Sequence, residues 1–194
     1  MNQDLRMTVY SALLAALIAA GAYIAIPIGP VPIALQSMFV LLAGLLLGKT
    51  WGLCAVAVYL MAGAAGLPVF AGAKGGMAVI IGPTGGYLLS YLAAVFVTGL
   101  ISQRTLKTYK KSKSKQIKTD MIAAIIGSVI VYTGGVPWLK LFFGFGWSKA
   151  LALGLYPFIL GDGFKVVAAA LIAQIVRPVI TQNIAKTSHE SNSN

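Results

Sequence analysis

Asp162 and Lys165 are expected to be the only acid and base within the apolar stretches of this sequence, in Gly161-Asp162-Gly163-Phe164-Lys165. A charged side chain at the centre of a membrane helix costs at least ~2.5–3.5 kcal/mol, so such residues usually face a cavity, a partner or a ligand. At a spacing of three residues the two side chains are neighbours on a helix. They can form an internal ion pair. They can also offer an acceptor beside a donor to a ligand that carries N–H and C=O or carboxylate groups.

The other reactive residue types do not favour catalysis. The one histidine, His189, lies in a polar tail, so no Ser–His pair is expected in the membrane. An aspartyl enzyme needs two carboxylates, and the apolar stretches are expected to hold only one. The one cysteine, Cys54, lies in an apolar run, which excludes an intrachain disulfide and a Cys-based metal cluster. We therefore expect no catalytic residue, no metal and no cofactor.

The segment Gly44-Leu45-Leu46-Leu47-Gly48-Lys49-Thr50 resembles a phosphate-binding loop. That motif needs four residues between its glycines, with a strand before it and a helix after it. Here three residues separate the glycines, and an apolar span precedes them. Lys49 is better explained as a cation at the end of a membrane helix. The chain is therefore not expected to hydrolyse ATP by itself.

The composition is that of an integral membrane protein. Hydrophobic residues make up 58% of the 194 residues and charged residues 10%, against roughly 25% charged in soluble domains. A span needs ~20 mainly apolar residues, which predicts an all-α bundle of six spans within residues 1–180. A basic connector at 103–120 and a polar C-terminal tail at 181–194 complete the organisation. The spans are expected at about 7–26, 33–48, 51–67, 84–102, 121–143 and 151–178.

Basic residues are distributed unevenly between the two sides of this bundle. Six spans put both termini on one side, which collects 11 of the 15 basic residues, and Lys74, Lys140 and Lys149 lie on the other. The positive-inside rule then makes both termini cytoplasmic, in a multi-pass protein of the cell membrane. A nucleic-acid-binding face would interleave aromatic residues with the basic ones. The basic residues behind the net charge of +11 are therefore interpreted as a topology signal that can also contact anionic lipid headgroups. Seven basic residues lie in the connector: Arg104, Lys107, Lys110, Lys111, Lys113, Lys115 and Lys118.

Proline and glycine cluster at residues 27–32 and 66–86, at the outward ends of the spans. Irregular backbone at membrane depth is tolerated only where it is buried in protein or lines a cavity. Pro157 lies near the outward end of the last span, so Asp162 is expected one to two turns deep, ~8–12 Å at 1.5 Å per residue. A pocket open to the outside would reach this depth. The glycine-rich segments are compatible both with ligand-facing loops and with plain turns.

Small residues recur every four positions in the first span. Ala12, Ala16 and Ala20 form one strip, and Ala15 and Ala19 form an adjacent one. Such strips let another helix approach closely. That helix can belong to the bundle itself or to a separate membrane subunit, and the spacing does not distinguish the two.

Several short motifs follow one another in order along the chain: Gly21–Pro27, Gly29–Gln36, Gly66–Phe70, Gly82–Tyr87, Gly135–Leu139 and Pro157–Lys165. Together they resemble the biotin transporter family, often called BioY, from about Leu5 to Val179. The resemblance implies a six-helix substrate-capture component, or S component, of an energy-coupling factor (ECF) transporter. Such a component binds biotin from outside and works with a transmembrane coupling protein and two cytoplasmic ATPases, which alone bind ATP.

The resemblance also implies site residues. Asp162 and Lys165 match the Asp and Lys of the family's last helix, and an Ala-x-x-x-Ala strip of the first helix would contact the coupling protein. Asp162 would accept from a ureido N–H of biotin, and Lys165 would donate to the ureido carbonyl or to the carboxylate. No cation lies between Thr84 and Gln103 to hold that carboxylate. Further substrate contacts are expected from Gln36, Phe70, Tyr87, Trp138 and Tyr132.

An alternative function is a solitary transporter of biotin or another small solute. Asp162 and Lys165 would then form a protonatable relay. Such a protein would take up solute in liposomes without ATPases, and collapse of the pH gradient would abolish the uptake.

Overall fold

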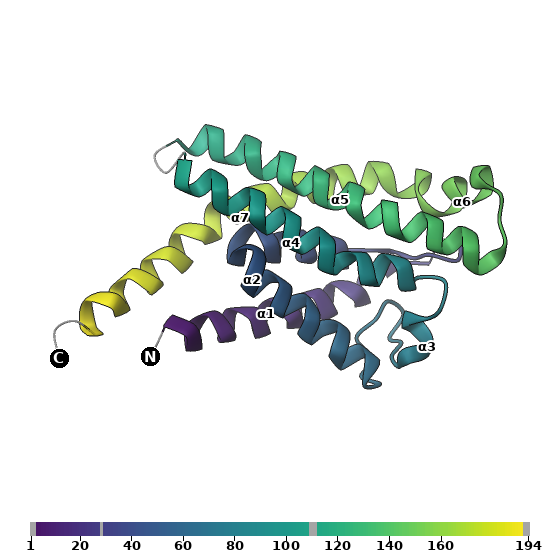
Figure 1. The fold of residues 1–194 in the computed structure, drawn as a ribbon, viewed down its shortest axis with the longest axis horizontal. Helices are drawn as coiled ribbons and strands as arrows, with labels where there is room; N and C mark the ends of the chain where they lie inside the picture. Colours follow the sequence, from purple (N-terminus) through teal and green to yellow (C-terminus); the bar gives the residue numbers. More distant parts are fainter. Residues whose placement is uncertain (1–2, 28, 109–111, 192–194) are drawn as a thin grey trace.

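The computed structural model describes residues 3–27, 29–108 and 112–191, with side chains for 3–27, 29–104 and 112–180. Helices account for most of the described chain, and a short antiparallel pair of strands connects the first two (Figure 1). The helices are α1 (Gln3–Tyr23), α2 (Gln36–Ala64), α3 (Met77–Ile80), α4 (Gly85–Thr108), α5 (Lys113–Phe143), α6 (Trp147–Gly154) and α7 (Tyr156–Ser191). The strands are β1 (Ala25–Ile26) and β2 (Ile33–Ala34).

Helix α2 folds back on itself at Gly48. This residue has φ 75° and ψ −170° inside a helix that is otherwise continuous. A Cβ placed on Gly52 would lie 3.0 Å from the carbonyl oxygen of Ala43, whereas nine residues of straight helix separate such positions by roughly 13 Å. Within the described residues, five helical segments are long and apolar enough to cross a membrane. Because α2 supplies two arms, they make six passes, which confirms the expected six-span all-α bundle.

Replacing Gly48 with alanine is expected to lower the free energy of unfolding by about 1–3 kcal/mol, because only glycine adopts this backbone region readily. The new methyl group would also meet the Gln103 side chain. Thermal unfolding in detergent measures the effect. Gly146→Ala is the matched control, since Gly146 has φ −66° and no atom within 4 Å of its Cβ position. Equal unfolding midpoints for both variants would contradict this explanation of the turn.

The chain termini and the pocket-forming loops lie at opposite ends of the bundle. Figure 1 shows the start of α1, the end of α4, the start of α5 and the end of α7 toward one end, with α3 and α6 at the other. Much of the expected connector is helix, because α4 extends to Thr108 and α5 begins at Lys113. Similarly, α7 continues through the expected tail to Ser191. Lysine and glutamine favour helix, so α4, α5 and α7 extend beyond their apolar sections.

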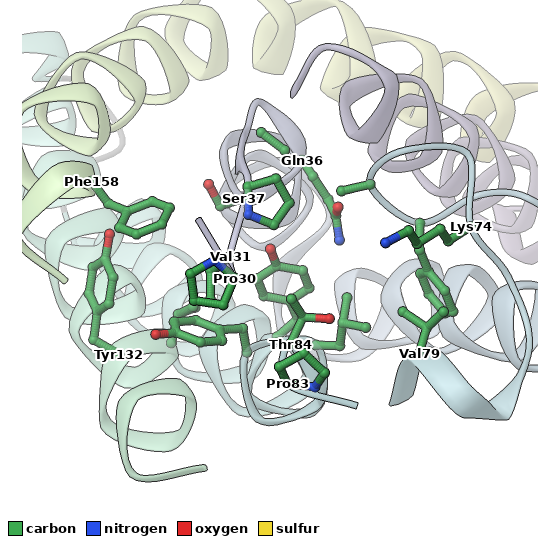
Figure 2. Close-up of a pocket in the computed structure, with 18 of the residues that line it drawn as sticks. Pro30, Val31, Gln36, Ser37, Lys74, Val79, Pro83, Thr84, Tyr132 and Phe158 are labelled. Atoms are coloured by element: carbon green, nitrogen blue, oxygen red, sulfur yellow. The ribbon is translucent and has the colours of Figure 1, made fainter. Parts of the chain in front are cut away.

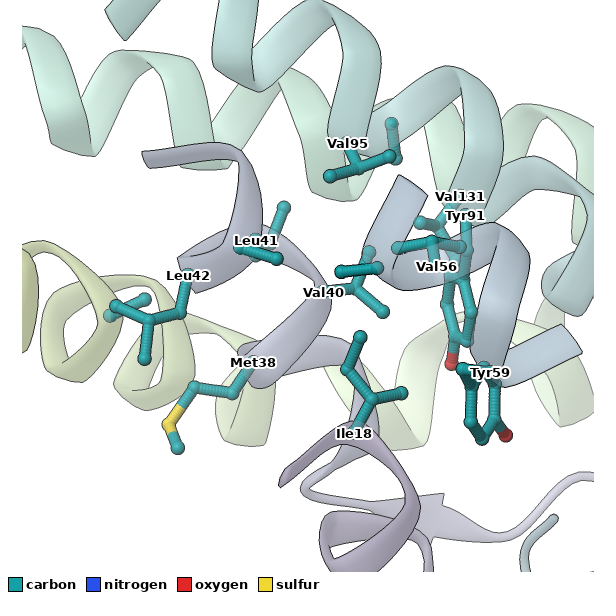
Figure 3. Close-up of a cluster of buried hydrophobic side chains, with 14 of the residues drawn as sticks. Ile18, Met38, Val40, Leu41, Leu42, Val56, Tyr59, Tyr91, Val95 and Val131 are labelled. Atoms are coloured by element: carbon teal, nitrogen blue, oxygen red, sulfur yellow. The ribbon is translucent and has the colours of Figure 1, made fainter. Parts of the chain in front are cut away.

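The core between the helices is apolar and tightly packed. Figure 3 shows Ile18 of α1, Val40 and Leu41 of α2, Val95 of α4 and Val131 of α5 within one cluster, and all five are buried. Apolar side chains also cover the outer surface of α1, α5 and α7. An apolar exterior around an apolar core suits a lipid environment.

Candidate functional site

A cavity of about 300 Å³ opens at the end of the bundle that carries α3 and α6. Its volume lies at the lower end of the usual ~300–1,000 Å³ for small-molecule sites. The walls come from the starts of α2, α4 and α7, from the middle of α5, and from the loops around residues 30–34 and 70–79. Figure 2 shows side chains from these elements converging on one space. Loop segments at residues 30–34, 70–79 and 83–84 thus join four long helices to build one site.

Asp162 and Lys165 form an ion pair on the wall of this cavity. The Lys165 Nζ lies 2.8 Å from Asp162 Oδ1 and donates a second hydrogen bond to the Ser37 hydroxyl at 3.3 Å. The Tyr132 hydroxyl donates to Asp162 Oδ2. The two charged side chains are only 8% and 16% exposed. The internal pair and the cavity-facing position therefore coexist, and a ligand would meet a charge pair already held in place.

Gln36, Phe70, Tyr87 and Tyr132 line the same cavity as the ion pair. The Phe70 ring fills the space that Gly63 leaves, because a Cβ on Gly63 would lie 2.1 Å from that ring. Tyr59 packs edge-on against Phe70, with ring centroids 5.6 Å apart. These contacts fix the loop that follows α2 against the bundle.

The hydroxyl of Tyr87 has a structural partner. It donates to the carbonyl oxygen of Gly154 at 2.8 Å, and its ring lies edge-on to Tyr132. Tyr87 thus presents an aromatic ring to the cavity while its polar atom ties α4 to the end of α6.

Trp138 was expected among the ligand contacts, but it does not line the cavity. Its indole N–H donates to the carbonyl oxygen of Gly82 at 2.9 Å. The ring packs where Gly85 and Gly86 lack side chains. The glycine-rich turn before α4 therefore accommodates the indole, and Trp138 stabilises this turn without facing the cavity.

The alanines of α1 divide between two faces. Ala12, Ala16 and Ala20 are exposed, whereas Ala15 is buried and Ala19 is partly buried. On the inner face, the Ser11 hydroxyl donates to the carbonyl oxygen of Trp51 in α2. The first strip is thus available on the outer surface, and the adjacent strip packs toward the bundle.

A second buried ion pair lies at the other end of the bundle, so the expectation that Asp162 and Lys165 were the only such residues is wrong. Asp120 of α5 is 1% exposed, and its carboxylate accepts hydrogen bonds from both terminal nitrogens of Arg177 of α7, at 2.9 and 3.0 Å. Gln174 and Ser102 also donate to Asp120, and Arg177 donates to the carbonyl oxygen of Leu45. In the sequence, Arg177 is one of the 11 basic residues assigned to the side of the termini, which predicts only a role in topology. The available signal was Asp120, one of four acids in the chain, directly before an apolar run.

Other cavity residues were not anticipated from the sequence. Ser37, Tyr91 and Phe158 face the cavity, and so does Lys74 from the glycine-rich loop. Lys74 had been counted only as one of the outward cations. Its place in the site depends on how the loop folds, which the local sequence does not specify.

The six-span bundle with a charged, aromatic pocket at one end defines a membrane-embedded protein that binds a small molecule. The model of the BioY family matches residues 1–182. The biotin transporter BioY of Thermotoga maritima is 41% identical over 169 residues, which cover 87% of this chain and 94% of the relative. The BioY of Rhizobium etli is also 41% identical, over 88% and 92% of the two chains. This chain belongs to the BioY family.

A solved structure has the same fold. It is described as the S-component for biotin from an ECF-type ABC transporter. The TM-score is 0.81 at 33% identity, and the alignment covers 92% of this chain and 95% of that one. The likeness thus spans nearly the whole of both chains.

Proposed function

We propose that this chain is the biotin-binding S component of an ECF-type importer. The observation that carries the proposal is the Asp162–Lys165 pair, fixed on the wall of an aromatic cavity in a member of the BioY family. The BioY relatives and the solved structure described above are transport components, and the chain is not an enzyme. It captures its ligand at one face of the membrane and delivers it with an ATPase module.

The chemistry of the cavity suits the two halves of biotin. The ureido ring has two N–H donors and one carbonyl. Asp162 has lone pairs left for a ureido N–H, and Lys165 has a third N–H for the carbonyl. Phe70, Tyr87 and Tyr132 offer aromatic surface to the apolar thioether ring.

The test of the proposal is a calorimetric titration of the purified chain in detergent against biotin and a panel of other vitamins. We expect tight, one-to-one binding of biotin alone. Absence of biotin binding, or tighter binding of another vitamin, would overturn the assignment of the ligand.

We place both termini and the α4–α5 connection in the cytoplasm, with the pocket facing outward. The support is the count of 11 basic residues against three and the separation of the start of α1 and the end of α7 from the cavity. A reporter that is active only outside the cytoplasm, fused after Asn194, should be inactive. The basic connection can also contact anionic lipid headgroups.

The strip Ala12, Ala16 and Ala20 is the proposed docking surface for the transmembrane coupling protein, beside which two ATPases complete the transporter. Replacing Ala16 with tryptophan is expected to abolish co-purification with the coupling protein, since a bulky ring prevents close helix approach. Biotin binding by the isolated chain should be unchanged. Ala93→Trp is the matched control, because Ala93 is also exposed but lies on α4. Normal assembly of the Ala16 variant would contradict this docking surface.

A further inference from the structure

Lys74 and Gln36 approach the cavity from the side opposite Tyr132 and Phe158. Figure 2 shows the amino group of Lys74 pointing toward the amide nitrogen of Gln36 across the cavity. Both groups are hydrogen-bond donors. Two donors that face one space suit an acceptor between them, and a carboxylate is the acceptor that such a pair binds most strongly.

Gln36 is buried and its Nε2 has no hydrogen-bond partner. The residue is 3% exposed at the start of α2. The Tyr59 hydroxyl lies close enough to interact with it, but the two groups are not in hydrogen-bonding geometry. A buried N–H without a partner costs about 1–3 kcal/mol. A ligand oxygen at this position would remove that cost.

The cavity has one more positive charge than negative. Among the described residues that line it, Asp162 is the only acid, and Lys165 and Lys74 are the cations. Asp162 pairs with Lys165, so the charge of Lys74 is not balanced within the lining. A cavity with one excess positive charge is complementary to a ligand with a single negative charge.

The backbone of Lys74 is held in a defined place. Its N–H and C=O pair with the C=O and N–H of Phe70, at 3.3 and 2.9 Å. The preceding residue, Ala73, has φ 56°, a conformation that costs non-glycine residues energy and is found mostly where the surroundings require it. At Gly75 a Cβ would lie 2.3 Å from the carbonyl oxygen of Leu67. The loop thus directs Lys74 toward the cavity, and its conformation depends on that packing.

We propose that Lys74, with Gln36, binds the carboxylate of the ligand, while Asp162 and Lys165 bind the ureido ring. This inference rests on the proposed function. It makes Lys74 the cation that binds the carboxylate, since the fourth span has no cation between Thr84 and Gln103. It also makes the glycine-rich loop after α2 the part of the chain that selects ligands with a negatively charged end.

The test compares biotin with biotinamide, whose carboxylate is replaced by a neutral amide, in calorimetric titrations of the purified protein. Lys74→Gln is expected to weaken biotin binding by about 10- to 100-fold, the range for a charge-assisted hydrogen bond. Its effect on biotinamide should be less than about threefold, since that ligand never made the charged contact. Lys149→Gln is the matched control: it removes an exposed lysine that does not line the cavity, and both affinities should stay unchanged.

The results separate the two proposals. Equal losses for biotin and biotinamide in Lys74→Gln, or no loss for either, would overturn the role of Lys74 while leaving the biotin site intact. Lys74→Arg keeps the charge and should retain most of the biotin affinity. A loss as large as that of the glutamine variant would assign the effect to shape and overturn the proposal. If the unmodified protein binds no biotin, the proposed function itself fails.

Discussion

Replacing Asp162 with asparagine is expected to weaken biotin binding by roughly 30- to 1,000-fold, about 2–4 kcal/mol. The substitution removes a charged acceptor and leaves the Lys165 ammonium without its counter-ion in a site where that side chain is 8% exposed. It also places an amide beside the Tyr132 hydroxyl, which donates to the carboxylate in the native protein. Calorimetric titration in detergent measures the loss.

Asp4→Asn is the matched control for this variant. Asp4 is exposed in the first turn of α1, so the same chemical change there should leave biotin affinity unchanged. Tyr132→Phe removes one hydrogen bond to Asp162 without removing a charge and should cost less than Asp162→Asn. A thermal unfolding scan without ligand separates lost affinity from lost folding. Unchanged affinity in the Asp162 variant would exclude its carboxylate from the site.

Replacing Asp120 with asparagine is expected to destabilise the fold by about 3–5 kcal/mol, because the guanidinium of Arg177 would remain buried without its counter-ion. The pair connects α5 to α7, and Arg177 also binds the carbonyl oxygen of Leu45 in α2. Arg177→Met should have a comparable effect by leaving the carboxylate unpaired. The midpoint of thermal unfolding in detergent measures both.

The double replacement Asp120→Leu with Arg177→Met provides the control. Replacing a buried ion pair by apolar side chains of similar size is often neutral or stabilising, so the double variant should recover much of the stability that each single variant loses. Biotin affinity of the folded fraction should stay near its normal value, because neither residue lines the cavity. A loss of stability in the double variant that equals the sum of the two single losses would show that the pair does not act as a unit.

The sequence predicted the six-span bundle and the Asp162–Lys165 pair because both depend on strong local signals. Apolar segment length defines a membrane span, and a charge in such a segment stands out. The turn at Gly48 also followed from local sequence, since glycine and lysine there interrupt the apolar run. These features do not require knowledge of which helices are neighbours.

The features that the sequence did not predict depend on contacts between distant segments. Asp120 and Arg177 are 57 residues apart, so neither could be assigned a partner from spacing. Trp138 has the residue type of a ligand contact, but its place is decided by glycines on α4. Spacing alone does not distinguish the exposed alanine strip of α1 from the inner one, whereas the contact of Ser11 with α2 and the burial of Ala15 do.

The first arm of α2 connects the two buried ion pairs, because Ser37 accepts a hydrogen bond from Lys165 and Leu45 accepts one from Arg177. Gln36 at its start lines the cavity, and Leu45 accepts a hydrogen bond from Arg177 near its end. At 1.5 Å per residue these positions are only about 13 Å apart, against ~30 Å of hydrocarbon in the surrounding bilayer. The apolar layer between these two positions is therefore short, and it includes Val40 and Leu41, which are buried. With the pocket facing outward, as proposed, this layer is the barrier that a ligand in the cavity has yet to cross, so the work of import would fall on the delivery step rather than on capture.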